Sequence, residues 1–452
     1  MTDSTVHVIQ VTFNTSSSLR TIHSKDGKVF KGDEFYGVLD GGPHGARSIQ
    51  MTADDEEHAA RRRILDRALP KGAQAFTTVD NLARVMVCTV KDHAGTTTAG
   101  EWSSPIEISA IIRWYSFDII SKVSFGQSLD LLGSEQFRWL PMCLERTSVF
   151  IYSIAFERNV TFWRWFMGTS LPSRLRMADA VEAQRYNAFA TDLFNKRKAK
   201  FQADVKKGAE PDAKDLFAHL LQANQCSDAD LQADSSLLVA AGSDAVRLTS
   251  LATIFYLLKY PRTLEKITAE IRSVVDSADM ISNAALSSME YLRACVDEAL
   301  RLSPPKAASI PREVGKGGIT VDGIFVPQGM TVAVSVYSLH HDPEVFPDPY
   351  AYRPERWIEA GNDQRMQAAF CPLLKGPRRC PGGTVAYLAI QLALFHLLYN
   401  YDICFAPGGA DADGLSGQSR LRWRQDEYHM NDWIIGFANG PIIRTRARAR
   451  AK

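Results

Sequence analysis

One stretch near the carboxyl-terminal end, Pro372 to Gly383, constrains this chain more than any other. It contains the sequence Gly-Pro-Arg-Arg-Cys-Pro-Gly-Gly, and an apolar segment, Val385 to Tyr399, follows it. Glycines allow positive φ angles and let the backbone approach a flat ligand closely. Neighbouring arginines and the amino terminus of the following helix favour the ionised form of Cys380. The stretch therefore predicts a tight loop that presents one thiolate to a metal, although an isolated cysteine is more commonly a buried structural residue.

Composition and charge exclude several other classes of protein. The 452 residues include 52 basic and 51 acidic side chains, so no nucleic acid or other polyanion is implied as a partner. The seven cysteines are scattered and form no Cys-x-x-Cys pair, which argues against a disulfide framework, a zinc ribbon or an iron–sulfur cluster. The first 30 residues hold no apolar run long enough for a signal peptide or a membrane span.

The cysteine loop resembles the haem-binding loop of the cytochrome P-450 family, whose iron is held by a cysteine thiolate. The family pattern Phe-x-x-Gly-x-Arg-x-Cys-x-Gly is matched at Gly376, Arg378, Cys380 and Gly382, with Leu373 where phenylalanine is usual. The resemblance implies haem b (iron protoporphyrin IX) as cofactor, with Cys380 as its axial ligand. It also implies that Leu373, Arg378 and Gly382 lie beside this cofactor.

Basic residues elsewhere in the chain resemble the groups that bind the haem propionates in this family. The segment Asp54 to Arg63 begins with acids and continues with bases, as the dipole of a helix prefers. His58 and Arg62 are four residues apart and share one helix face. Taken alone, such a segment is more commonly a solvated charged helix. The resemblance implies that His58, Arg62, Arg312 and Arg378 contact the propionates.

The segment Ser235 to Tyr260 predicts a long apolar helix that contains a glycine and an acid. Both are costly inside a buried helix unless something requires them. The segment resembles the family's central helix, with its motif Ala-Gly-x-Asp-Thr, at Ala241, Gly242 and Asp244, whereas Ala245 replaces the threonine. The resemblance implies that these four residues line the oxygen side of the haem, where Gly242 leaves room for dioxygen.

The alanine at position 245 leaves the type of chemistry open. In the family, the threonine hydroxyl helps to deliver protons to bound dioxygen. Ser243, Thr249 or a substrate hydroxyl with water could supply the proton here instead. Otherwise the chain is a haem-thiolate enzyme without the usual oxygen activation, such as an isomerase, a dehydratase or an oxidative-coupling catalyst.

A third pattern joins a carboxylate to two arginines. Glu298 and Arg301 lie three residues apart on a predicted helix, Met289 to Leu302, and Arg356 follows in Pro-Glu-Arg-Trp. Alone, Glu-x-x-Arg is most often a surface ion pair. With the other motifs it resembles the family's Glu/Arg/Arg brace, in which one buried carboxylate is shared by two guanidinium groups and locks the haem loop.

The rest of the chain predicts mostly helices. Apolar spacing predicts a strand over residues 5–13 and a short helix over 16–24, followed by a loop over 25–50. The aromatic run 162–167 is interpreted as core or channel lining, 206–215 as a polar linker, and 444–452 as a solvated basic tail. Further helices are predicted at 81–90, 106–123, 137–156, 178–203 and 385–399, and short strands at 319–334. The resemblance implies one mainly α domain over residues 1–452, the cytochrome P-450 fold, with a large helical part and a small β-rich side.

The function implied by the resemblance is that of a monooxygenase. It would insert one oxygen atom from O2 into a hydrophobic small molecule, in fungal secondary metabolism or detoxification, as in the group that includes pisatin demethylase. The sequence has no dinucleotide-binding glycine motif, so electrons from NADPH are expected through a separate NADPH–cytochrome P-450 reductase.

Location and assembly are expectations from the family as well. We expect a monomer on the cytoplasmic side of the endoplasmic reticulum, with the family's amino-terminal anchor and hinge absent and no transmembrane segment in the chain. Contact with a membrane surface stays open. If the missing anchor is genuine, the protein is cytosolic; a shortened form that binds haem without activity is a further alternative.

Overall fold

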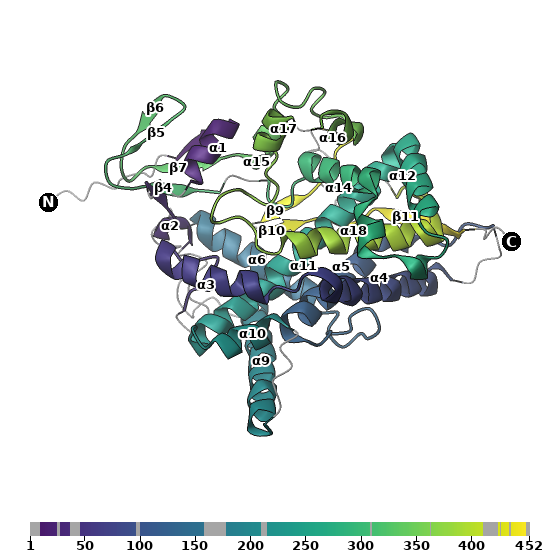
Figure 1. Ribbon diagram of the computed structural model, residues 1–452, viewed down its shortest axis with the longest axis horizontal. Coiled ribbons are helices and arrows are strands. Elements are labelled where there is room, and N and C mark those ends of the chain that lie inside the picture. Colours follow the sequence, from purple (N-terminus) through teal and green to yellow (C-terminus); the bar gives the residue numbers. More distant parts are fainter. Residues whose placement is uncertain are drawn as a thin grey trace.

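The computed structural model describes residues 10–24, 28–36, 46–95, 100–157, 178–208, 215–307, 310–361, 363–409, 424, 426–433 and 435–448. Most of these residues are helical, and short strands form small sheets at the edges of the helical part (Figure 1). The mainly α fold with a small β-rich side is therefore confirmed. The aromatic run 162–167 and most of the predicted linker 206–215 lie outside the described residues.

Helix α11, Asp228–Lys259, lies in the middle of the helical part (Figure 1). It contacts α5, α9, α14 and α18, and every residue from Val246 to Leu257 is buried. The helix begins seven residues before the predicted start, because its first two turns are polar and lack the apolar spacing. The Ser227 hydroxyl and the Asp230 carboxylate mark this start as a capping box, in which each side chain bonds the other residue's backbone N–H.

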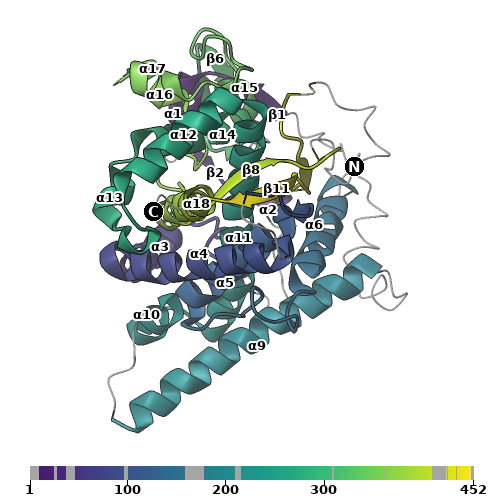
Figure 2. The ribbon, with the colours of Figure 1, turned by 90° about the vertical axis from the view of Figure 1, so that its right-hand side faces the viewer.

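The other helices agree with most of the predicted segments. Helix α9 extends across one side of the molecule, below α5 and α10 in Figure 2. The predicted loop 25–50 also contains, in its described part, a two-residue strand and one short helix. The bounds are α1 Ser16–Ile22, α2 Asp33–Tyr36, α3 Asp55–Ala68, α4 Gly72–Ala94, α5 Ile108–Phe125, α6 Leu140–Glu157, α9 Ala178–Lys206, α10 Leu216–Ala223, α12 Pro261–Val274, α13 Asn283–Ser287, α14 Glu290–Leu302, α15 Val336–His340, α16 Glu355–Glu359, α17 Gln364–Ala369 and α18 Gly383–Asn400.

A four-stranded sheet brings distant parts of the chain together in the order β1-β7-β4-β2. Strand β1 is parallel to β7, and the other pairs are antiparallel. The pairing of β2 with β4 places Phe30 opposite Glu313, so Lys31, which follows β2, lies close to Arg312. The bounds are β1 Gln10–Phe13, β2 Val29–Phe30, β4 Arg312–Val314 and β7 Thr331–Val334.

Three smaller sheets complete the β part, and one of them corrects a prediction. Strand β11 pairs with β8 and β3, so residues 444–447 belong to a sheet and are not a solvated tail. Arg444 donates to the carbonyl groups of Ser103 and Trp102, which fixes its side chain. The bounds are β3 Ile106–Glu107, β5 Ile319–Val321, β6 Ile324–Val326, β8 Tyr401–Phe405, β9 Asn431–Trp433, β10 Ile435–Phe437 and β11 Ile442–Ala447.

Within the described part of the chain, α11 and α18 are long and apolar enough to cross a membrane. Most of the apolar window of each helix is buried inside the protein. Both helices therefore have the surroundings of core helices, as was predicted for the segment 385–399.

Candidate functional site

The cysteine loop is held in a tight conformation by its own backbone. The Cys380 N–H donates to the Leu373 carbonyl at 2.9 Å. Gly376 has a φ of +76°, and a Cβ atom there would lie 2.0 Å from the carbonyl oxygen of His23, at the end of α1. A side chain at this position is therefore excluded by both the backbone angle and the close approach of α1.

The thiol of Cys380 lies at the amino terminus of α18. Burial raises its pKa, while the backbone N–H groups of Gly382 and Gly383 and the charge of Arg62 act in the opposite direction. Although protein atoms surround its sulfur on most sides, Cys380 is exposed. A sulfur held in this way, with N–H donors and a cation beside it, is suited to ligation as a thiolate.

Arg378 joins the cysteine loop to α3 and the residues just before it. Its guanidinium group donates to the carbonyl groups of Thr52 and Ala53 at 2.8 and 3.1 Å, and it pairs with Asp55, the first residue of α3, at 2.6 Å. Contact of Arg378 with a propionate stays a prediction.

Four basic side chains gather beside the loop: Lys31, His58, Arg62 and Arg312. Burial lowers the pKa of His58 to about 3, and the charges of Arg378, Lys31 and Arg62 contribute. Burial also lowers the pKa of Lys31 to about 6, with Arg378 and Arg312 adding to the effect and Asp55 opposing it.

These shifts indicate a surplus of positive charge in a buried place. Lys31 is 7% exposed and Arg312 is 5% exposed. Burying several cations together is unfavourable unless anions accompany them. The two propionates of haem b are such anions, and a porphyrin with its iron at Cys380 requires one thiolate and nearby cations. The residues present therefore fit the haem group.

Residues of α11 divide between two faces of that helix. Ala241 is exposed and Ala245 half-buried, although the residues around them are mainly buried, so this face borders accessible space. A Cβ atom on Gly242 would lie 2.2 Å from Cδ1 of Ile120 in α5. Gly242 thus permits close packing of α5 on α11, which differs from the prediction that it leaves room for dioxygen.

Asp244 is buried beside a second charged residue of α11. Its Oδ1 atom accepts a hydrogen bond from Arg247 at 3.3 Å, whereas Oδ2 has no hydrogen-bond partner in the described part of the chain. Burial raises the pKa of Asp244 to about 6, and the charges of Arg247 and Arg113 limit this rise.

The two hydroxyl groups considered as substitutes for the missing threonine are differently placed. The Ser243 hydroxyl bonds the carbonyl groups of Val239 and Ala240, at 2.9 and 3.1 Å. Thr249 is 1% exposed, and its hydroxyl has no hydrogen-bond partner among the residues that the structure describes. The Ser243 hydroxyl is therefore bonded to its own helix, whereas Thr249 lies four residues after Ala245, on a neighbouring part of the helix surface, with an unpaired hydroxyl.

The predicted brace is present and contains further donors. Glu298 is fully buried and accepts hydrogen bonds from Arg301 at 2.9 and 3.0 Å and from Arg356 at 2.9 Å. The indole of Trp357 and the backbone N–H of Arg353 add one bond each, both 3.0 Å long. The carboxylate is thus surrounded by donors, as a buried charge requires.

His340 links this brace to the segment that leads into the cysteine loop. Its Nε2 atom accepts the N–H of Cys371 at 3.0 Å, so Nδ1 carries the proton and donates to the Arg301 carbonyl at 3.2 Å. Burial lowers the pKa of His340 to about 3, which keeps the ring neutral. The ring therefore serves as a hydrogen-bonded connector, and the adjacent His341 points to other partners.

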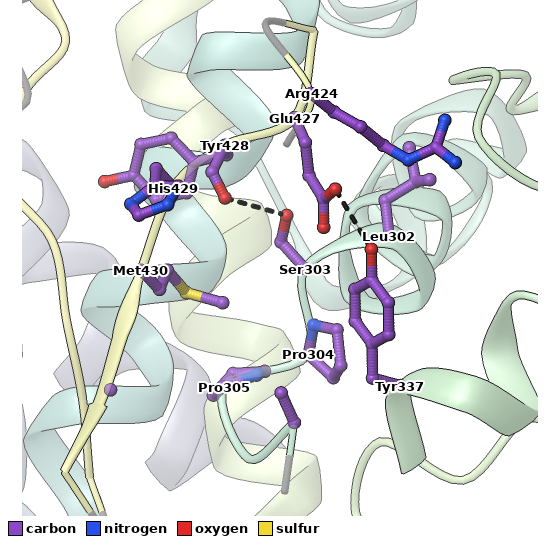
Figure 3. A pocket seen from close by; sticks show the side chains of 12 residues that line it. Leu302, Ser303, Pro304, Pro305, Tyr337, Arg424, Glu427, Tyr428, His429 and Met430 are labelled. Atoms are coloured by element: carbon purple, nitrogen blue, oxygen red, sulfur yellow. Dashed lines mark hydrogen bonds between the residues drawn. The ribbon is translucent and has the colours of Figure 1, made fainter. Parts of the chain in front are cut away.

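A cavity of about 430 Å³ lies between the end of α14 and the segment that leads into β9 (Figure 3). Tyr337 closes one side by donating to Glu427 at 3.0 Å, and Ser303 bonds the Tyr428 carbonyl. Leu302, Pro304, Pro305 and Met430 provide apolar walls, and Gly436 of β10 also lines the cavity.

Three residues of the site were missed by sequence reasoning. Lys31 and Tyr36 lie in a segment predicted only as loop; Tyr36 accepts a hydrogen bond from Arg312, and the Lys31 ammonium donates to the Gln50 carbonyl. Trp357 follows the predicted Arg356 directly. A lysine and a tyrosine between short apolar runs carry no distinctive signal, since only the β2–β4 pairing brings them to Arg312.

Comparisons with known proteins agree with this geometry. A family model described as Cytochrome P-450 matches residues 6–430. A cytochrome P-450 monooxygenase of Gibberella zeae is 31% identical over 419 residues, covering 90% of this chain and 93% of that protein. The cytochrome P-450 monooxygenase poxM of Penicillium oxalicum is 29% identical over 458 residues, covering 98% of this chain and 82% of that protein. The chain belongs to the cytochrome P-450 family.

Proposed function

We propose that this protein is a haem-thiolate monooxygenase that inserts one oxygen atom from O2 into a hydrophobic small molecule, in fungal secondary metabolism or detoxification. The observation that carries the proposal is the Cys380 thiol, placed at the start of α18 beside the N–H groups of Gly382 and Gly383 and close to a buried basic cluster. Its fungal relatives are named cytochrome P-450 monooxygenases, which supports the reaction class.

Each part of the site has a role in this proposal. Cys380 would hold the haem iron through its thiolate, and a haem held in this way would supply the electron density that favours cleavage of the O–O bond. Lys31, His58, Arg62 and Arg312 would hold the propionates. Ala241 and Ala245 border the space in which substrate lies, and the brace around Glu298 keeps the loop in place.

Electrons would come from NADPH through a separate reductase at the endoplasmic reticulum. Arg379 is exposed next to the ligand, and Lys375 precedes it in the same loop. Basic residues on this surface would favour the approach of an acidic protein partner. We propose that the protein acts there as a monomer.

The test is the carbon monoxide difference spectrum of the reduced, purified protein. Wild type should show the long-wavelength Soret band of thiolate-bound iron, and Cys380→Ser should lose it. Cys88→Ser removes an exposed cysteine of α4 and should keep the band. A wild-type band at the position of histidine-ligated haem proteins would contradict the proposal, as would protein that takes up no haem.

A second candidate function is favoured by one observation on α11. Ala245 has no hydroxyl, and that of Ser243 is bonded to its own helix, so the accessible face lacks a hydroxyl at these two positions. A haem-thiolate isomerase, dehydratase or coupling enzyme would not need this group. Incubation with ¹⁸O-labelled dioxygen separates the two, since the label enters the product only in the monooxygenase reaction.

A further inference from the structure

Arg247 is a buried cation in the middle of α11 whose hydrogen bonds go to another element. The residue is 2% exposed. Its guanidinium donates to the carbonyl groups of Ala438 and Gly436 at 2.9 and 3.0 Å and to Asp244 at 3.3 Å. A buried guanidinium is unfavourable unless it is paired and hydrogen-bonded, so these three acceptors together determine where it lies.

The Gly436 carbonyl belongs to β10, the second strand of the β9–β10 hairpin, and the Ala438 carbonyl lies just after that strand. Gly436 is packed tightly against α11, because a Cβ atom there would lie 2.7 Å from Leu248 and 3.2 Å from the Pro305 carbonyl. On another side, Gly436 borders the cavity of about 430 Å³ shown in Figure 3. The hairpin therefore has open volume beside it, and the bonds from Arg247 hold it on the helix.

The hairpin lies over the same face of α11 as the candidate substrate space. Leu248, which contacts Gly436, is three residues after Ala245 and so shares its face. The hairpin thus covers the helix about one turn beyond the accessible face of Ala241 and Ala245. A shift of the hairpin would change the length or width of the space along that face.

A second arginine, which is half-buried, contacts the end of the same segment. Arg113 of α5 donates to the Asn439 side chain at 3.1 Å. The segment 436–439 is thus held from α11 and from α5, by side chains and not by a continuous sheet. Removing the α11 contacts would free residues 436 and 438, whereas Asn439 would remain attached.

We propose that Arg247 is a specificity-determining positioning residue, which sets the place of the β9–β10 hairpin over α11 and thereby the shape of the substrate space. This proposal rests on the haem-thiolate function proposed above. Arg247 itself acts through the backbone of residues 436 and 438, and it touches neither the haem ligand nor, in this geometry, the accessible face.

The test compares Arg247→Met with a matched variant, Arg272→Met. Arg272 of α12 has the same kind of partners, two carbonyl groups at 3.0 Å (Leu398 and Tyr401) and one carboxylate at 2.9 Å (Asp402), but it lies away from the hairpin. Both variants therefore lose a comparable set of hydrogen bonds. Only Arg247→Met should change the position of the β9–β10 hairpin.

The readouts are optical titrations of the ferric protein with two probes. Imidazole reports access to the iron, and clotrimazole, an imidazole with a bulky triaryl group, reports the shape of the space. In Arg247→Met, the ratio of the two Kd values should change at least fivefold, with the thiolate band retained. In Arg272→Met it should stay within twofold. Deuterium uptake by peptides covering 435–440 should rise only in Arg247→Met.

The outcomes separate the two proposals. An unchanged Kd ratio and unchanged deuterium uptake in Arg247→Met, with a normal thiolate band, would overturn the role of Arg247 alone. A missing thiolate band in wild type would overturn the proposed function and this inference with it. If Arg247→Met does not fold, Arg247→Lys, which keeps the charge but has fewer donors, should still change the ratio at least twofold; no change would overturn the inference.

Discussion

The indole nitrogen of Trp357 donates a hydrogen bond to Oε2 of Glu298 at 3.0 Å. Oε1 of the same carboxylate already accepts from Arg301, Arg353 and Arg356, whereas Oε2 has Arg301 as its other donor. The tryptophan therefore completes the hydrogen bonding of a fully buried carboxylate.

Replacing Trp357 by Phe should keep the ring packing and remove this one bond. Hydrogen bonds to charged groups contribute about 1.5–3 kcal/mol, so unfolding free energy should fall by roughly that amount. Denaturant titration measures it. Ile358→Ala, at an exposed neighbouring position, is the control and should stay within about 0.5 kcal/mol of wild type. A Trp357→Phe protein as stable as wild type would show that the bond is dispensable.

Gly376→Ala should prevent formation of the cysteine loop in its observed shape. The added Cβ would meet the His23 carbonyl at 2.0 Å, and the φ of +76° adds about 1–2 kcal/mol of strain. We expect little folded protein or a strongly lowered Tm. Gly382→Ala is the comparison, because a Cβ there would have no atom of the described residues within 4 Å; this variant should fold. Equal Tm values for the two variants would contradict the argument.

Lys31→Met should have opposite effects on the haem-free and the haem-bound protein. In the haem-free fold, the pKa of Lys31 is lowered from 10.5 to about 6, so between these values folding releases a proton and burial of the lysine costs stability. The variant should therefore raise the Tm of the haem-free protein at pH 7, and the gain should shrink as the pH approaches 10. Lys28→Met, at an exposed position, should leave the Tm of the haem-free protein unchanged both at pH 7 and near pH 10.

The same variant should weaken haem binding and flatten its dependence on pH. Two propionates beside Lys31 would raise its pKa above about 6, so haem binding takes up a proton. Haem affinity should then be highest below about pH 6, and it should fall as the pH rises through the pKa that Lys31 has in the haem complex. Transfer of haem to apomyoglobin at several pH values measures this. An identical pH profile in Lys31→Met would place the propionates elsewhere.

Ala245→Thr should improve the coupling of NADPH oxidation to product, if proton delivery is limited by the missing hydroxyl. The new side chain would lie on the accessible face of α11, whereas Ser243 bonds its own backbone. Product and hydrogen peroxide formed per NADPH should be measured with a substrate found by optical binding. Ala240→Thr, one residue before this face, should not improve coupling. High coupling in wild type and no change in Ala245→Thr would show that another group supplies the proton.

Local chemistry made several features predictable from the sequence. Gly376, Arg378, Cys380 and Gly382 lie within seven residues, and their spacing specifies a loop around one sulfur. The pair of Glu298 and Arg301 follows from helical periodicity. The structure confirms the helical fold and brings Glu298, Arg301 and Arg356 together. Both follow from helical periodicity and from the need of a buried carboxylate for donors.

The roles of other residues depended on which distant segments meet. Arg378 was expected at a propionate, and no local pattern indicated that it would also bond three backbone carbonyl groups before α3 and Asp55, more than 320 residues away in sequence. Gly242 was expected to leave space, but the packing of α5 fills that space with Ile120.

The sequence by itself determined the helical character and the family, and it singled out Cys380 as the proposed ligand, since these are carried by local spacing and by apolar periodicity. Only the tertiary structure decided that Lys31 joins Arg312, that Trp357 completes the Glu298 site and that Arg247 holds the β9–β10 hairpin. The physical reason is that a charge or hydrogen bond has its effect through the partner it meets, and sheet pairing and helix packing choose that partner.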